Sequence, residues 1–118
     1  MQSLYENLSV YKSALDLTVY FEKVVRGFDR YYKYTVGTDL RNLSRRILIL
    51  ITKANTKSIR KETLIEVLDK LEELKILIRV SKEVKAFKSF NGFEFATKSV
   101  IEVIKQCEGW LRSQNPLN

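Results

Sequence analysis

The sequence predicts an all-α fold, an antiparallel up-down four-helix bundle formed by residues 1–118 as a single domain. Its only proline is Pro116, so no residue from Met1 to Asn115 lacks a backbone N–H or forces a kink. Four stretches repeat apolar residues every three or four positions, as one face of a helix requires. With 45% apolar residues in 118, the chain can bury about two thirds of its unfolded surface in one core.

The first helix is expected at about residues 4–27. Ser3 and Glu6 fit a capping box at its start. Gly27 can adopt the left-handed conformation that ends helices, and residues 28–37 have no clear period, which predicts a loop. The apolar face of this helix is expected to contain Leu4, Leu8, Tyr11, Leu15, Thr18, Val19 and Val25.

The second helix is expected to begin after an N-cap at Thr35 or Thr38 and to end before a turn at residues 55–58. Residues 47–52 form a β-branched run that is also compatible with a buried strand. We favour the helix, because no neighbouring segment alternates with period two and a lone strand cannot pair. The predicted face is Leu40, Leu43, Ile47, Leu50, Ile51 and Ala54.

The third helix is expected from a cap at Ser58 to about Phe87, with Asn91-Gly92 as the break before a fourth helix that ends near Ser113. Short connections between amphipathic helices are typical of an antiparallel bundle. The third face is predicted to contain Leu64, Val67, Leu68, Leu71, Leu74 and Ile78. The fourth is predicted to contain Phe93, Ala96, Val100, Val103, Ile104, Cys107 and Leu111.

The absence of histidine excludes most familiar hydrolase mechanisms. The chain has no histidine, so it lacks Ser-His-Asp and Cys-His nucleophiles and every zinc site that needs histidine. Its single cysteine, Cys107, cannot form an internal disulfide and fits a small core residue. We therefore expect a cytoplasmic protein that is not an enzyme and has no metal or cofactor. The longest apolar run, Ile47–Ile51, is far shorter than the roughly 20 residues needed to cross a membrane.

The net charge is +7, with 21 basic and 14 acidic residues, which favours nucleic acid or an anionic surface as partner. Most of the excess lies in the middle of the chain. Residues 35–56 carry four basic side chains and one acidic one, and residues 57–90 carry nine and six.

The third helix is divided by charge. Acidic residues occupy its first half and basic residues its second half, an order that complements the helix dipole by about 0.3–1 kcal/mol per charge. However, Lys75, Arg79 and Lys82 also lie close enough on one stripe to repel each other, which favours an anion-binding role. The acids are Glu62, Glu66, Asp69 and Glu73, and the bases continue to Lys85 and Lys88.

The second helix carries basic residues on two adjacent stripes. Arg41 and Arg45 lie on one stripe, and Asn42, Arg46 and Lys53 lie on the other. Two interpretations stand. Guanidinium groups bind phosphates bidentately, so this helix beside the lysine-rich one would form a groove for a nucleic-acid backbone. Alternatively, Arg45 or Arg46 pairs with an acid of the third helix, namely Glu62, Glu66 or Glu73.

Aromatic residues cluster twice, after the first helix and around the last turn. The first cluster contains Arg30 and Lys33 and would stack bases, but such clusters more often seal the end of a bundle or form an oligomer contact. Gly109, before Trp110, suggests that a neighbouring helix approaches closely there. The clusters are Phe28, Tyr31, Tyr32 and Tyr34, and Phe87, Phe90, Phe93 and Phe95.

Several motifs follow one another in an order that resembles a known family. Residues 28–40, FDRYYKYTVGTDL, resemble an aromatic-basic loop that enters a helix at Thr-Val-Gly. Residues 71–85, LEELKILIRVSKEVK, are similar to a third-helix pattern, and Phe95-Ala96 with Glu108-Gly109-Trp110-Leu111 resembles the fourth helix and its ending. The family is that of the accessory variability determinant (Avd) of diversity-generating retroelements and the related 23S rRNA intervening-sequence proteins.

The resemblance implies a homopentameric barrel of four-helix bundles that binds RNA or DNA, largely without sequence preference, and docks a reverse transcriptase. An alternative is an intervening-sequence protein that binds RNA without a reverse transcriptase, and another is a structural homo-oligomeric module. The residues predicted to contact nucleic acid or a partner are Arg41, Arg45, Arg46, Lys53, Lys75, Arg79, Lys82 and Lys85.

Overall fold

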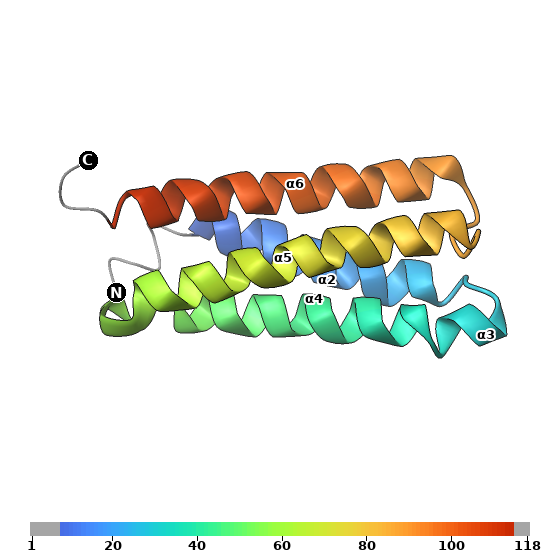
Figure 1. The fold of residues 1–118 in the computed structure, drawn as a ribbon, viewed down its shortest axis with the longest axis horizontal. Coiled ribbons are helices and arrows are strands. Elements are labelled where there is room, and N and C mark those ends of the chain that lie inside the picture. Colours follow the sequence, from blue (N-terminus) through green and yellow to red (C-terminus); the bar gives the residue numbers. More distant parts are fainter. Residues whose placement is uncertain (1–7, 115–118) are drawn as a thin grey trace.

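The computed structural model describes residues 8–114, which form four long helices packed side by side in a body of 47 × 21 × 19 Å (Figure 1). No strand occurs in this range, so the strand considered for residues 47–52 is wrong and this run is helical. The long helices are α2 (Leu8–Val25), α4 (Val36–Lys53), α5 (Arg60–Glu83) and α6 (Phe90–Arg112), and the short elements are α3 (Arg30–Lys33) and the 3-10 turn η1 (Lys57–Ile59).

The core lies where α4 and α6 each pack against both α2 and α5. The predicted faces of α4, α5 and α6 are confirmed, since most of their residues are buried in the core. The other four are partly buried and pack against the core: Leu43, Leu68, Phe93 and Leu111. Leucine, isoleucine and valine at helical spacing therefore place three of the four long helices correctly.

The predicted face of α2 is mostly wrong. Leu8 and Val19 are exposed, whereas only Thr18 and Val25 of the predicted set are buried. The helix instead buries a second series with the same spacing, and its small Ala14 fits against the neighbouring helices. That series is Val10, Ala14, Leu17, Thr18, Phe21 and Val25. The capping box at Ser3 and Glu6 lies outside the described residues.

The connection between α2 and α4, residues 26–35, has the same length as the predicted loop but contains the short helix α3. Gly27 does not have the expected left-handed conformation. Thr35 occupies the N-cap of α4 but does not cap it, since its hydroxyl donates to the Tyr31 carbonyl at 2.8 Å. The glycine that this region requires is Gly37, where an added Cβ would lie 2.6 Å from Val25 Cγ1.

The third helix ends earlier than predicted, at Glu83, and the fourth begins at Phe90. Lys85 supplies the left-handed residue of this turn with φ 63°. Ser89 caps α6 by accepting a hydrogen bond from the backbone N–H of Gly92, so Asn91-Gly92 lies inside the helix and does not break it. Ser58, the expected cap of α5, lies within η1 instead.

Candidate nucleic-acid interface

Arg41 and Arg45 of α4 bind the carboxylate of Glu22 on α2. Arg45 Nε donates to Glu22 Oε2 at 2.6 Å, and Arg41 Nε lies 3.4 Å from Glu22 Oε1. Arg41 Nη2 also donates to the Glu22 backbone carbonyl at 3.0 Å. The hydrogen bond from Arg45 lowers the pKa of Glu22, and Glu22 raises the pKa of Arg45 in return. The acidic partner of Arg45 is therefore on the first helix, and the expectation of a partner on the third helix is wrong for this residue.

Arg46 and Lys53 lie on a different side of α4 and form no ion pair with any residue that the structure describes. The groove between α4 and α5 contains one basic residue, Arg46, with two carboxylates and several apolar side chains. The basic residues of α4 and those of α5 therefore do not line one groove together, which contradicts the predicted groove of arginine and lysine side chains. Its lining is Asp39, Asn42, Leu43, Arg46, Glu73, Ile76 and Leu77.

The basic stripe on α5 is accompanied by acids of the same helix. Lys75 Nζ lies 3.3 Å from a carboxylate oxygen of Glu72. Arg79 and Lys82 both contact Glu83, at 2.8 and 3.4 Å, and this contact lowers the pKa of Glu83. These acids offset part of the mutual repulsion expected from sequence, while the basic side chains remain accessible to a ligand.

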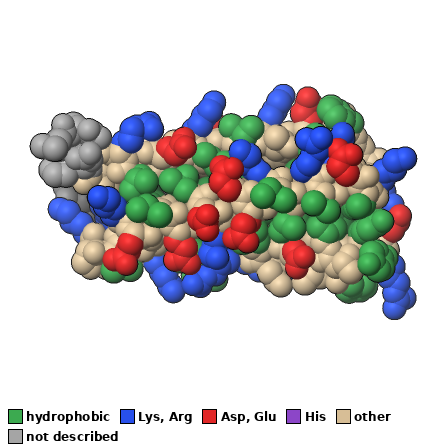
Figure 2. Space-filling model, in the orientation of Figure 1, with side chains coloured by type: hydrophobic (Ala, Val, Ile, Leu, Met, Phe, Trp, Pro, Cys, Tyr) green, Lys and Arg blue, Asp and Glu red, His purple; other side chains and the backbone are tan. Residues whose placement is uncertain are grey.

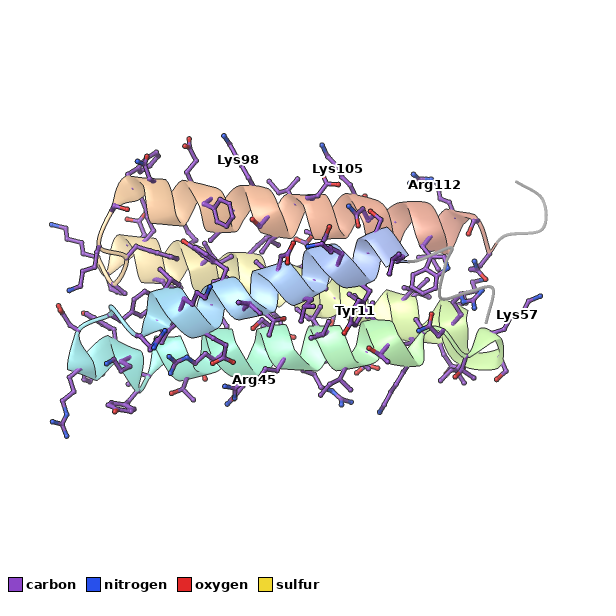
Figure 3. The ribbon with its side chains drawn as sticks, turned by 180° about the vertical axis from the view of Figure 1, so that it is seen from behind. Tyr11, Arg45, Lys57, Lys98, Lys105 and Arg112 are labelled. Atoms are coloured by element: carbon purple, nitrogen blue, oxygen red, sulfur yellow. The ribbon has the colours of Figure 1, made fainter. Side chains whose placement is uncertain are left out.

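This stripe lies on the side of α5 that faces α6. Lys82 Nζ is 5.6 Å from the ring centroid of Phe93, which belongs to the first turn of α6. On α6 itself, three basic residues follow one another at intervals of seven and point away from the bundle (Figure 3). Sequence reasoning missed them because residues 91–118 have no net charge, although their spacing is visible. They are Lys98, Lys105 and Arg112.

The α5 stripe leads to one end of the bundle, where the connections before α4 and after α5 lie together (Figure 1). Lys88 of the second connection contacts the carboxylate of Asp29 in the first. Tyr31, Tyr34 and Phe90 are 71%, 68% and 62% exposed at this end. We call it the basic aromatic end, and its cations are Arg30, Lys33, Lys85 and Lys88.

The two aromatic clusters predicted separately meet here. Phe28 and Phe87 are buried, with ring centroids 5.4 Å apart in an edge-to-face contact. Phe87 in turn lies 6.2 Å from Phe93. These rings seal the end of the core, as expected, and leave the exposed rings around them available for contacts with a partner.

A buried arginine that sequence reasoning did not single out closes the opposite end. Arg60 donates to the backbone carbonyls of Ala54 and Asn55, at 2.8 and 3.0 Å, just beyond the C-terminus of α4. Its guanidinium lies 5.3 Å from the ring centroid of Trp110 on α6. Because a cation at a helix C-terminus complements the dipole, this buried arginine stabilises the fold.

The close helix approach predicted at Gly109 is absent. The nearest group to an added Cβ there is a side-chain nitrogen of Arg112, at 3.7 Å, which is an ordinary contact. Cys107 is buried as predicted, and burial raises the pKa of its thiol to about 12.

Within residues 8–114, no group of three acidic or cysteine side chains is placed to hold a metal ion. No helix in that range is long and apolar enough to cross a membrane. No protein-family model, curated protein or solved structure matches the chain.

Proposed function

We propose that this chain is a non-enzymatic, cytoplasmic accessory protein of a diversity-generating retroelement, and that it binds RNA or DNA with little sequence preference. In this proposal it associates with the reverse transcriptase and the template RNA to support mutagenic cDNA synthesis. The bundle is antiparallel and assembles as a homopentamer. The order of the Avd-like motifs supports the family, and the distribution of charge supports nucleic acid as ligand.

The observation that carries the nucleic-acid proposal is the continuity of the α5 stripe with the basic aromatic end. Single-stranded nucleic acid is bound without sequence preference by cations that follow the backbone and aromatic rings that stack on bases. The stripe supplies Lys75, Arg79 and Lys82, and the end supplies Lys85 beside exposed rings. These side chains contact phosphate or bases, whereas Arg41 and Arg45 hold α4 to α2 through Glu22.

Fluorescence anisotropy with a labelled single-stranded RNA tests this proposal. Binding is expected at about 50 mM salt and is expected to weaken steeply toward about 200 mM, because counterions released from phosphates drive it. Equal affinity at both salt concentrations, or no binding at the lower one, would contradict it. Replacing Tyr31 and Tyr34 with alanine is expected to weaken binding with little change in its salt dependence, because stacking releases no counterions.

The reverse transcriptase partner is tested separately. A reverse transcriptase gene and a template repeat beside the gene for this chain would support the retroelement assignment, and co-purification of the two proteins would establish the contact. A position inside a 23S rRNA gene would indicate the intervening-sequence protein instead. Absence of nucleic-acid binding at low salt would favour a structural homo-oligomeric module.

A further inference from the structure

An acidic groove runs between the first half of α5 and the second half of α6. Its apolar floor includes Ile65, which is 52% exposed, together with Leu68 and Ile104. Red side chains gather over the left and middle of this face in Figure 2. The carboxylates that surround the floor are Glu62, Glu66, Asp69, Glu72 and Glu108.

The internal contacts of the chain do not account for this groove. Glu72 is paired with Lys75, but Glu62, Glu66 and Asp69 form no ion pair with a residue that the structure describes. The helix dipole favours acids only in the first turn, so it does not explain Asp69. No three of the described acids are placed to hold a metal ion. Repelling carboxylates around an exposed apolar floor, in a chain of net charge +7, fit an extended basic surface better than a small cation.

A surface of that kind exists on the same chain. Asn42, Arg46, Ile49 and Lys53 follow one another at intervals of four, three and four, so they form one stripe along α4, which we call the α4 ridge. Ile49 is 49% exposed between the two cations. Neither cation has an acidic partner within the described residues, whereas Arg45, next along the helix, is bound to Glu22.

The ridge and the groove match in pattern and spacing. Each surface has an exposed isoleucine among charged side chains. The charges of the ridge are positive and those of the groove are negative. Arg46 and Lys53 are seven residues apart, as Glu62 and Asp69 are, and seven helical residues span about 10.5 Å.

We infer that the acidic groove of one copy binds the α4 ridge of a second copy. Because the ridge and the groove are different surfaces of the chain, the contact is head-to-tail, and in the homo-oligomer of the proposed function its repetition forms a ring. This inference rests on the homo-oligomer of the proposed function and is independent of nucleic-acid binding. It buries Arg46 and Lys53 between subunits and leaves the α5 stripe and the basic aromatic end for RNA.

Light scattering coupled to gel filtration tests this contact with three charge-reversal variants. The ridge variant is R46E/K53E, the groove variant is E62K/D69K, and the third combines all four substitutions. The wild type is expected to elute as a multimer, and each two-residue variant as a monomer of 13.8 kDa. The combined variant restores opposite charges across the contact, so it is expected to recover the multimer.

The control is K98E/K105E, which has the same charge change and the same seven-residue spacing as the ridge variant but lies outside the contact. It should remain a multimer. Circular dichroism confirms that each variant is folded, and if a reversal unfolds the chain, R46Q/K53Q replaces it and is expected to weaken assembly at least about tenfold. A monomeric wild type, an assembled ridge or groove variant, or a combined variant that stays monomeric would each overturn the inference.

RNA binding of the same variants separates this inference from the proposed function. A ridge variant that is monomeric and still binds single-stranded RNA supports both. A wild-type multimer that ignores RNA contradicts nucleic-acid binding while leaving the contact intact. An assembled ridge variant with lost RNA binding would place the α4 ridge against phosphates and overturn the inference.

Discussion

Neutralising the exposed end of the α5 stripe, as R79Q/K82Q, is expected to weaken binding of single-stranded RNA strongly at low salt. Both side chains project from one stripe, and Glu83 is their one acidic partner among residues 8–114, so both can reach phosphates. Each phosphate contact with a single strand contributes about 0.7 to the salt slope. Loss of two contacts therefore predicts an affinity about sixtyfold lower at about 50 mM salt and about tenfold lower at about 200 mM.

Fluorescence anisotropy with a labelled oligouridylate of about 20 nucleotides measures this effect across the same salt range. The slope of log affinity against log salt is expected to decrease by about 1.4. The variant K12Q/K23Q on α2 provides a control with an equal loss of charge away from the stripe. If the α5 variant and the control have the same slope and affinity, the stripe does not contact phosphate and the reasoning is refuted.

Three further predictions concern the fold. G37A is expected to lower the free energy of unfolding by about 1–3 kcal/mol, because its Cβ would overlap Val25, and unchanged stability in urea would contradict this. Arg45 lowers the pKa of Glu22, so the stabilisation from Glu22 is present above its unfolded pKa of 4.5 and is lost as the pH falls through the folded value. Urea unfolding of wild type and E22Q should therefore differ at pH 7 and converge in acid, and a gap that stays constant with pH would refute the ion pair. The thiol of Cys107, with a pKa of about 12, should resist a thiol reagent at pH 8 until the chain is unfolded, and rapid labelling of the native protein would show that it is not buried.

Three core faces were predictable because the spacing of large aliphatic residues is unambiguous in those helices. Leu64, Leu71 and Ile78 belong to the most regular apolar series of α5, and all three are buried. The charge division of α5 was also visible in the sequence. Which surfaces the acidic and basic halves of α5 form depends on the helices that pack beside it, and these are α4 and α6.

The face of α2 was not predictable because this helix carries two apolar series with the same helical spacing. Leu8 and Val19 belong to one series, and Leu17 and Phe21 to the other. Periodicity cannot rank the two, since the choice depends on where α4 and α6 contact the helix. Ala14, which is 1% exposed, is too small to mark a core face by its hydrophobicity alone.

The partner of Arg45 depends on tertiary structure in the same way. Glu22 lies 23 positions before Arg45 in the sequence. It belongs to α2, and α4 packs against both α2 and α5. Glu62 and Glu66 of α5 are nearer to Arg45 in the sequence than Glu22 is, and α5 carries more acids than α2, so the sequence alone favours α5. The acidic groove also needed the structure, because Glu108 and Ile104 of α6 complete it.

The most direct test of the central claim is mass determination by light scattering, with and without a short single-stranded RNA, at about 50 mM and then about 200 mM salt. An assembling, RNA-binding bundle predicts a particle near five chains that binds the RNA at low salt and releases it as the salt rises. A monomer of 13.8 kDa whose mass is unchanged by RNA at either salt concentration would contradict both the assembly and the function.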